Sequence, residues 1–288
     1  MCEHCGNDLN HGHSHDHDGQ AQPRYTVRRV TAPFTPSGPA VLSARGLVCA
    51  YPGANGGGNG NGNGLVLDGL DFDLHPGQRI GLYGPNGCGK TTLLSALMGL
   101  ITPKSGQVRH LDRPVTSPED WRTLRLSVGL VLQHADDQIL FPTVLDDVAF
   151  GPLNMGLTPD AARAAALEAL TFLGLSGFED RLTHRLSGGE KKLVTLAGVL
   201  AMKPKALLLD EPSASLDPAT RERLAAALAG LDVATLVVSH DWDFLEQTSG
   251  EYWTIRHGKL VRDEAPVVHH HAHAHPAAGP HVHTGLKG

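Results

Sequence analysis

The feature that most constrains the fold is the glycine-rich stretch GPNGCGKT at residues 84–91. It follows a strand-like segment, QRIGLY, and precedes a helix-like segment, TTLLSALMGL. Glycines let a backbone curl so that its N–H groups point at phosphate oxygens, and the following helix adds the positive end of its dipole. The pattern G-x-x-x-x-G-K-[ST] in this context predicts a phosphate-binding loop. The loop comprises Gly84, Pro85, Asn86, Gly87, Cys88, Gly89, Lys90, Thr91 and Thr92.

Two side chains of this loop are suited to a nucleotide. Lys90 supplies a point charge for the β- and γ-phosphates, and the Thr91 hydroxyl can ligate Mg²⁺. Cys88 is expected to be a spacer, the alternative being a redox-sensitive thiol. The alternative for the whole stretch is a glycine-rich turn before an unrelated helix, which the flanking segments disfavour.

A second candidate element is ALLLDEP at residues 206–212. Four apolar residues followed by Asp210 are typical of a central strand that ends in a carboxylate, which can hold Mg²⁺ through water. Glu211 is placed to polarise an attacking water. The alternative is a buried strand capped by two solvated acids, which the upstream phosphate loop disfavours.

Strands and helices interleave along the chain. Strands are predicted on both sides of a turn at 75–77, at 128–133, 206–212 and 234–240, and helices at 160–175 and 189–202. This alternation predicts an α/β core with a largely parallel sheet. Order is expected from about residue 41. The segments 1–40, 53–64 and 263–288 are predicted to be a disordered arm, a flexible Gly/Asn-rich loop and a disordered tail.

The sequence LSGGE at 186–190 adds a second anion-binding helix start, because Ser187, Gly188 and Gly189 precede a helix. With this motif, which ends at Glu190, residues 41–262 resemble the ATP-binding cassette (ABC) ATPases. The resemblance implies a P-loop NTPase core, an antiparallel β subdomain and a helical subdomain at about 137–186. It also implies hydrolysis of ATP with Mg²⁺.

The resemblance assigns further roles. It implies that Tyr51 stacks on adenine, although a tyrosine before Pro52 is also typical of turn packing. Gln133 would link the nucleotide to the helical subdomain, Asp217 would cross a dimer interface, and His240 would orient the γ-phosphate. It implies catalytic roles for Glu211, His240 and Gln133, and Mg²⁺ binding by Thr91, Gln133 and Asp210. ATP would lie between the loop of one subunit and motif 187–190 of a second copy, head to tail in a homodimer.

The stretch QHADDQILFPTVLDDVAFGPLNMGL at 133–157 is similar to the cobalt/nickel branch of the energy-coupling-factor (ECF) importers. One departure is Lys191, Lys192 and Leu193, where most relatives carry Gln-Arg. The resemblance implies a transmembrane coupling protein that docks on the helical subdomain, a metal-binding membrane subunit, and a peripheral place on the cytoplasmic face of the cell's inner membrane. Nickel and cobalt both stay open as substrates.

Twelve of the 18 histidines lie near the two ends of the chain. Neutral imidazole and thiolate suit transition metals, so these ends could receive or buffer an imported ion. The alternative is a low-complexity tail with incidental affinity. The candidate ligands are Cys2, His4, Cys5, His11, His13, His15, His17, His269, His270, His271, His273, His275, His281 and His283.

Composition excludes some classes. A net charge of −6 argues against a nucleic-acid partner. No apolar run approaches a membrane span and no signal peptide is visible, so a cytosolic chain is expected. Three alternatives remain: an ECF vitamin importer, a non-transport ABC ATPase, and a metal-storage or sensing protein with a regulatory cassette.

Overall fold

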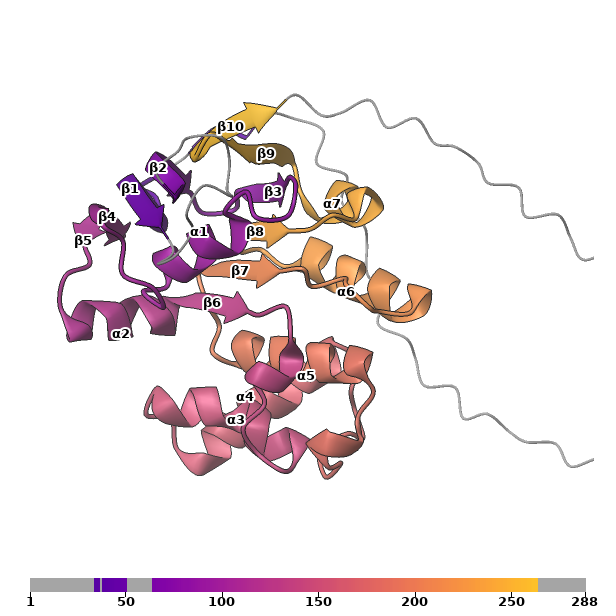
Figure 1. Ribbon diagram of the computed structural model, residues 1–288. Coiled ribbons are helices and arrows are strands. Elements are labelled where there is room, and N and C mark those ends of the chain that lie inside the picture. Colours follow the sequence, from indigo (N-terminus) through magenta and orange to yellow (C-terminus); the bar gives the residue numbers. More distant parts are fainter. Residues whose placement is uncertain (1–33, 37, 51–63, 264–288) are drawn as a thin grey trace, which may run out of the picture.

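The computed structural model describes residues 34–36, 38–50 and 64–263. Tyr51, both histidine-rich ends and most of the Gly/Asn-rich segment lie outside the described residues. Two sheets and the helices around them make up the described chain (Figure 1). None of these helices combines the length and apolar character that a membrane crossing requires.

The larger sheet has, among the described residues, six strands in the order β10-β9-β3-β8-β7-β6. All neighbouring pairs are parallel except β9 with β10. Both β7 and β8 are fully buried apolar runs, which is typical of strands covered on two faces. Its strands are β3 (Arg79–Tyr83), β6 (Val128–Val131), β7 (Ala206–Asp210), β8 (Ala234–Val238), β9 (Glu251–Arg256) and β10 (Lys259–Asp263).

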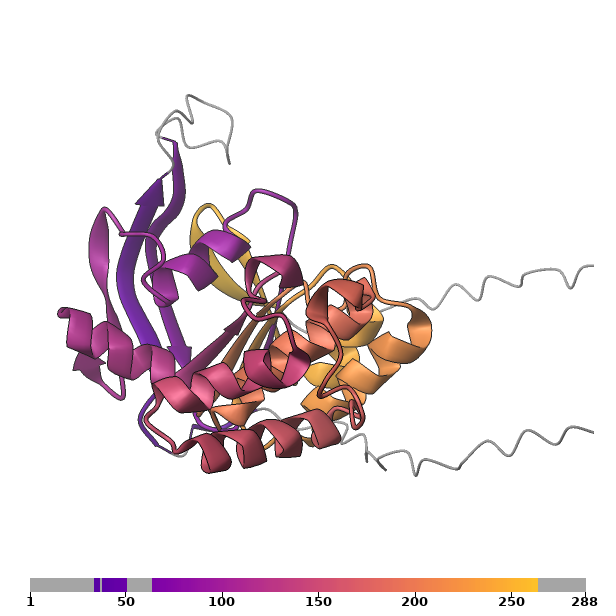
Figure 2. The ribbon, with the colours of Figure 1, turned by 90° about the horizontal axis from the view of Figure 1, so that it is seen from below.

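The smaller sheet is antiparallel, with the order β2-β1-β4-β5 in the described chain. Helix α1 (Lys90–Leu97) lies between the two sheets (Figure 2), and its leucines share one core with both. The strands are β1 (Leu42–Ala50), β2 (Leu65–Leu74), β4 (Ser105–His110) and β5 (Arg113–Pro114). Helix α2 (Pro118–Ser127) follows β5.

Three helices lie together beyond the β6 edge (Figure 1) and share a second apolar core. They are α3 (Val144–Asn154), α4 (Pro159–Phe172) and α5 (Gly188–Ala201), with side-chain caps from Thr143, Thr158 and Ser187 respectively. Helices α6 (Pro218–Gly230) and α7 (Trp242–Thr248) pack against each other. The predicted fold class, a mostly parallel core with an antiparallel sheet and a helical part, is confirmed.

Some predicted boundaries were wrong by a few residues. The strand predicted at 128–133 ends at Val131, because the Gln138 side chain, not a neighbouring strand, bonds the Leu132 N–H. The strand predicted at 234–240 ends at Val238, and the chain then turns into the cap of α7 at Asp241.

Candidate nucleotide site

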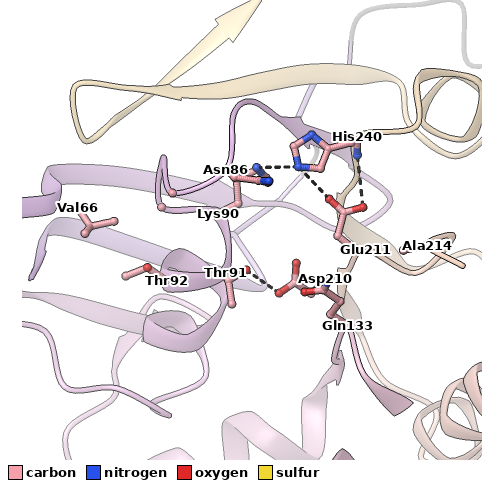
Figure 3. A pocket seen from close by; sticks show the side chains of 12 residues that line it. Val66, Asn86, Lys90, Thr91, Thr92, Gln133, Asp210, Glu211, Ala214 and His240 are labelled. Atoms are coloured by element: carbon pink, nitrogen blue, oxygen red, sulfur yellow. Dashed lines mark hydrogen bonds and ion pairs between the residues drawn. The ribbon is translucent and has the colours of Figure 1, made fainter. Parts of the chain in front are cut away.

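A cavity of about 610 Å³ opens where α1 begins and where β7 and β8 end (Figure 3). Most of its lining was predicted from sequence, although the residues come from segments far apart in the chain. They are Val66, Asn86, Gly87, Gly89, Lys90, Thr91, Thr92, Gln133, Asp210, Glu211, Ala214 and His240.

The loop between β3 and α1 has the curled backbone that its glycines predict. Gly84, Gly87 and Gly89 have φ values of 139°, 79° and 114°, which favour glycine. At Gly89 an added Cβ would lie 3.0 Å from both Val66 Cγ1 and Leu67 Cδ2. Helix α1 starts with no side-chain cap from the described chain, so its first N–H groups remain available for an anion.

The Lys90 side chain is buried within this loop. Its Nζ donates to the carbonyl oxygens of Gly84 at 2.7 Å and Pro85 at 3.0 Å, and it lies 3.4 Å from His240 Nε2. An ammonium held here faces the cavity that the loop amides surround. The arrangement provides positive charge for a bound phosphate.

Asp210 ends β7 beside Thr91, whose hydroxyl donates to Asp210 Oδ2 at 2.8 Å. Burial raises the pKa of this carboxyl, partly offset by the hydrogen bond from Thr91. A buried carboxylate next to a hydroxyl oxygen is a donor set that Mg²⁺ prefers, and a cation would offset the cost of burial. These two residues therefore fit the predicted ion.

Glu211 and His240 lie next to each other in the lining of the cavity (Figure 3). Glu211 Oε1 lies 3.4 Å from His240 Nε2, and the His240 backbone N–H donates to Oε2 at 3.4 Å. Glu211 has a φ of 46°, in the left-handed region that residues other than glycine rarely adopt. Its Oε1 is buried and receives no hydrogen bond from the described chain, although it lies within ion-pair distance of the His240 ring.

Gln133 is exposed and lines this cavity together with an adjoining one of about 180 Å³. The segment that carries it is fixed by Gln138 in the D-D-Q run. Gln138 accepts from the Leu132 N–H at 2.6 Å and donates to the Leu130 carbonyl at 2.9 Å. The run drew attention in the sequence, but this anchoring role was missed.

Other predicted site residues do not line the cavity of the described chain. The Ser187 hydroxyl accepts from the Glu190 N–H at 3.3 Å, and the Glu190 carboxylate accepts from the Ser187 N–H at 2.7 Å. These two hydrogen bonds form a capping box at the start of α5. Asp217 caps α6 through the Thr220 N–H. Cys88 is buried beneath the loop. The predicted site residues that are absent from the lining of the 610 Å³ cavity are Gly84, Pro85, Cys88, Ser187, Gly188, Gly189, Glu190 and Asp217.

Val66 and Ala214 line the cavity but were not predicted. Val66 reaches it because β2 lies against the loop, and Ala214 because the chain turns back after β7. Neither residue type carries a signal for a ligand, so sequence alone could not identify them.

Comparisons with known proteins show the family of the chain. The model of the ABC transporter family matches residues 67–214. A putative ABC transporter ATP-binding protein of Nitratidesulfovibrio vulgaris is 46% identical, over 86% of this chain and 92% of its own length. The cobalt import ATP-binding protein CbiO of Rhodobacter capsulatus is 42% identical, over 78% and 79% of the two chains.

A solved structure of cbiO1 from Clostridium perfringens, described as part of the ABC transporter complex cbiONQ, has a TM-score of 0.66 and 32% identity. It covers 77% of this chain and 87% of that one. A strand–loop–helix phosphate site of this kind on a mostly parallel sheet defines a nucleotide-hydrolysing P-loop protein. The chain belongs to the ABC transporter family, as an ATP-binding subunit that hydrolyses ATP.

Proposed function

We propose that the chain energises import of a transition-metal ion, nickel or cobalt, through an ECF-type ABC transporter. The observation that carries this proposal is the 42% identity with a cobalt import ATPase over most of both chains. The stretch 133–157 supports it, because its D-D-Q run and V-A-F-G-P-x-N segment resemble the cobalt/nickel branch of the ECF importers.

Hydrolysis would use the residues around the cavity. Lys90 and the loop amides bind the phosphates, and Glu211 orients or deprotonates water. His240, beside both Lys90 and Glu211, stabilises the transferred phosphoryl group. Thr91, Asp210 and Gln133 would hold Mg²⁺, which neutralises phosphate charge when bound. Catalysis on this plan is mainly positioning and charge stabilisation.

A second copy of the chain would complete each site. Ser187 and Gly189 lie outside the main cavity of their own chain, yet they belong to a glycine-rich helix start. In a head-to-tail homodimer they would meet the γ-phosphate held by the other copy, with Asp217 near the interface. Closure and reopening of the dimer would drive transport.

The membrane partner would dock on the helical part. Around α3 the described chain exposes Leu140, Phe150, Leu153, Met155 and Leu157, with exposed fractions from 37% to 67%. Exposed apolar side chains on and beside one helix are typical of a protein interface, and an amphipathic helix of a coupling protein fits such a surface. The subunit would then sit peripherally on the cytoplasmic face of the inner membrane.

The histidine-rich ends would receive or buffer the ion on that face. Titration calorimetry of a peptide of residues 1–20 with Ni²⁺ or Co²⁺ tests this role. Affinity tighter than about 1 mM supports buffering, and weaker affinity identifies the ends as passive chelators.

Uptake of radiolabelled Ni²⁺ and Co²⁺ tests the function itself. Cells lacking the gene are complemented with the wild type or with Lys90→Ala. We expect uptake of one metal to return only with the wild type. Unchanged uptake of both metals would favour a vitamin importer of the same class, for which labelled vitamins are the next substrates.

A further inference from the structure

Lys192 contacts the hydrolytic segment from another helix. It lies in α5, just beyond the 187–190 motif, with a half-buried side chain. Its Nζ donates to the carbonyl oxygens of Glu211 and Ala214, both at 2.8 Å, and lies 3.4 Å from that of Pro212. An ammonium has three donors and no acceptor, so these three carbonyls match its whole capacity.

The segment that Lys192 contacts has an unusual backbone. Glu211 and Ser215, at its two ends, have left-handed φ values of 46° and 62°. Such values in residues other than glycine persist only where surrounding contacts hold them. The Glu211 N–H donates to the Val238 carbonyl and the Ala214 N–H to the Glu211 carbonyl. Lys192 is the side chain that gathers the carbonyls of 211, 212 and 214 on one side.

The charge of Lys192 has a cost that these contacts offset. Burial lowers the pKa of its ammonium, while the nearby Glu211 and Asp210 carboxylates act in the opposite direction. Lys192 is absent from the lining of the 610 Å³ cavity and lines the adjoining cavity of about 180 Å³, so it contacts the Glu211 backbone from outside the main cavity. An apolar side chain could fill the same volume, but it could not hold three carbonyls.

We propose that Lys192 is a positioning residue for hydrolysis: it fixes the backbone from which Glu211 reaches the attacking water. It also joins the start of α5 to the hydrolytic carboxylate of the same chain, so that the two move together. The inference rests on the role proposed for Glu211.

The test compares Lys192→Met with Lys203→Met in single-turnover hydrolysis of radiolabelled ATP. Lys203 follows the other end of α5, and the ion pair of its side chain within the described chain is with exposed Glu168, at 3.1 Å. Because small displacements of a catalytic group are costly, we expect Lys192→Met to lower the rate about 10- to 100-fold. Binding of ATPγS should stay within about twofold, and Lys203→Met should match the wild type in both measurements.

A second background shows whether Lys192 acts through Glu211. In Glu211→Gln we expect Lys192→Met to cause no further loss of rate, because the group that it positions is already disabled. An equal fold-loss in both backgrounds would overturn the inference, as would a wild-type rate in Lys192→Met. Lys192→Arg keeps the charge, so its hydrolysis rate should lie between those of Lys192→Met and the wild type. If Lys192→Met fails to fold, the same two backgrounds are compared with Lys192→Arg instead.

The same measurements separate this inference from the proposal on which it rests. A Glu211→Gln variant with near-normal hydrolysis would show that Glu211 is not the hydrolytic group. An inactive Glu211→Gln with a fully active Lys192→Met would leave Glu211 in place and remove only Lys192.

Discussion

Helices α1 and α5 both begin at glycine-rich stretches, but their first turns are satisfied differently. At α1 the residue before the helix is Gly89, and no side chain of the described chain caps it. At α5 Ser187 and Glu190 form a reciprocal capping box. The first N–H groups of α1 thus remain available for a ligand in the cavity of the same chain. At α5 the capping box already satisfies N–H groups of the first turn without a ligand.

A third helix provides a reference for this comparison. Helix α2 begins with the same kind of capping box, formed by Ser117 and Asp120, which are not in the lining of the nucleotide cavity. A capping box alone therefore indicates a helix start and not a ligand site. What sets α5 apart is its pair of glycines and its link, through Lys192, to the segment after β7.

The largest expected effect is at the open helix start. Lys90→Ala removes the buried ammonium that we propose binds the phosphates, so ATP hydrolysis should fall on the order of 100- to 1,000-fold. Steady-state phosphate release measures this loss. A rate within tenfold of the wild type would mean that the loop amides of α1 suffice without the charge.

Glycine substitutions test the difference in backbone. Gly89→Ala places a Cβ 3.0 Å from two side chains at a φ of 114°, and should destabilise the protein by about 1–3 kcal/mol. At Gly188 a Cβ has no atom within 4 Å, so Gly188→Ala should be neutral or slightly stabilising. Urea unfolding of both variants without nucleotide makes the comparison. Equal destabilisation by the two substitutions would show that α1 and α5 do not differ in their need for glycine at these positions.

Removing the caps separates stability from function. Ser187→Ala and Ser117→Ala each delete one capping hydroxyl and should each cost about 1 kcal/mol of unfolding free energy. If α5 meets a nucleotide held by a second copy, only Ser187→Ala should also lower ATP hydrolysis at saturating ATP. Matching hydrolysis rates in the two variants would argue against that contact.

The smallest expected effect is the pH dependence of the stabilisation that Asp120 gives the start of α2. Backbone N–H groups of Ser117 and Thr116 lower the pKa of Asp120 from 3.8 to about 2. The unfolded chain then binds more protons between these values, so the stabilisation is complete above the unfolded pKa and is lost as pH falls toward 2. The stability difference between wild type and Asp120→Asn should shrink over that range in urea titrations. A difference independent of pH would contradict the assignment.

Sequence reasoning recovered the parts of the site that are local in the chain. The phosphate loop, Asp210 and Glu211 each follow or precede an apolar strand, and such junctions are visible in sequence. The S-x-x-D pattern at 117–120 also marks a helix start, yet it was not used. Val66, Gln138 and Lys192 act through contacts that depend on packing. The sequence marks Gln138 and Lys192 as parts of family motifs, but it does not show which backbone groups they contact.

The position of β3 has a consequence for biosynthesis. This strand leads into the phosphate loop, and its sheet neighbours are β8 and β9. Both neighbours begin more than 150 residues later in the chain, at Ala234 and Glu251. A ribosome would therefore have made most of the polypeptide before β3 could gain a partner on either side, and such distant pairings form slowly. Nucleotide would then bind only near the end of translation, and a nascent chain halted before β8 would expose an unpaired β3 to chaperones.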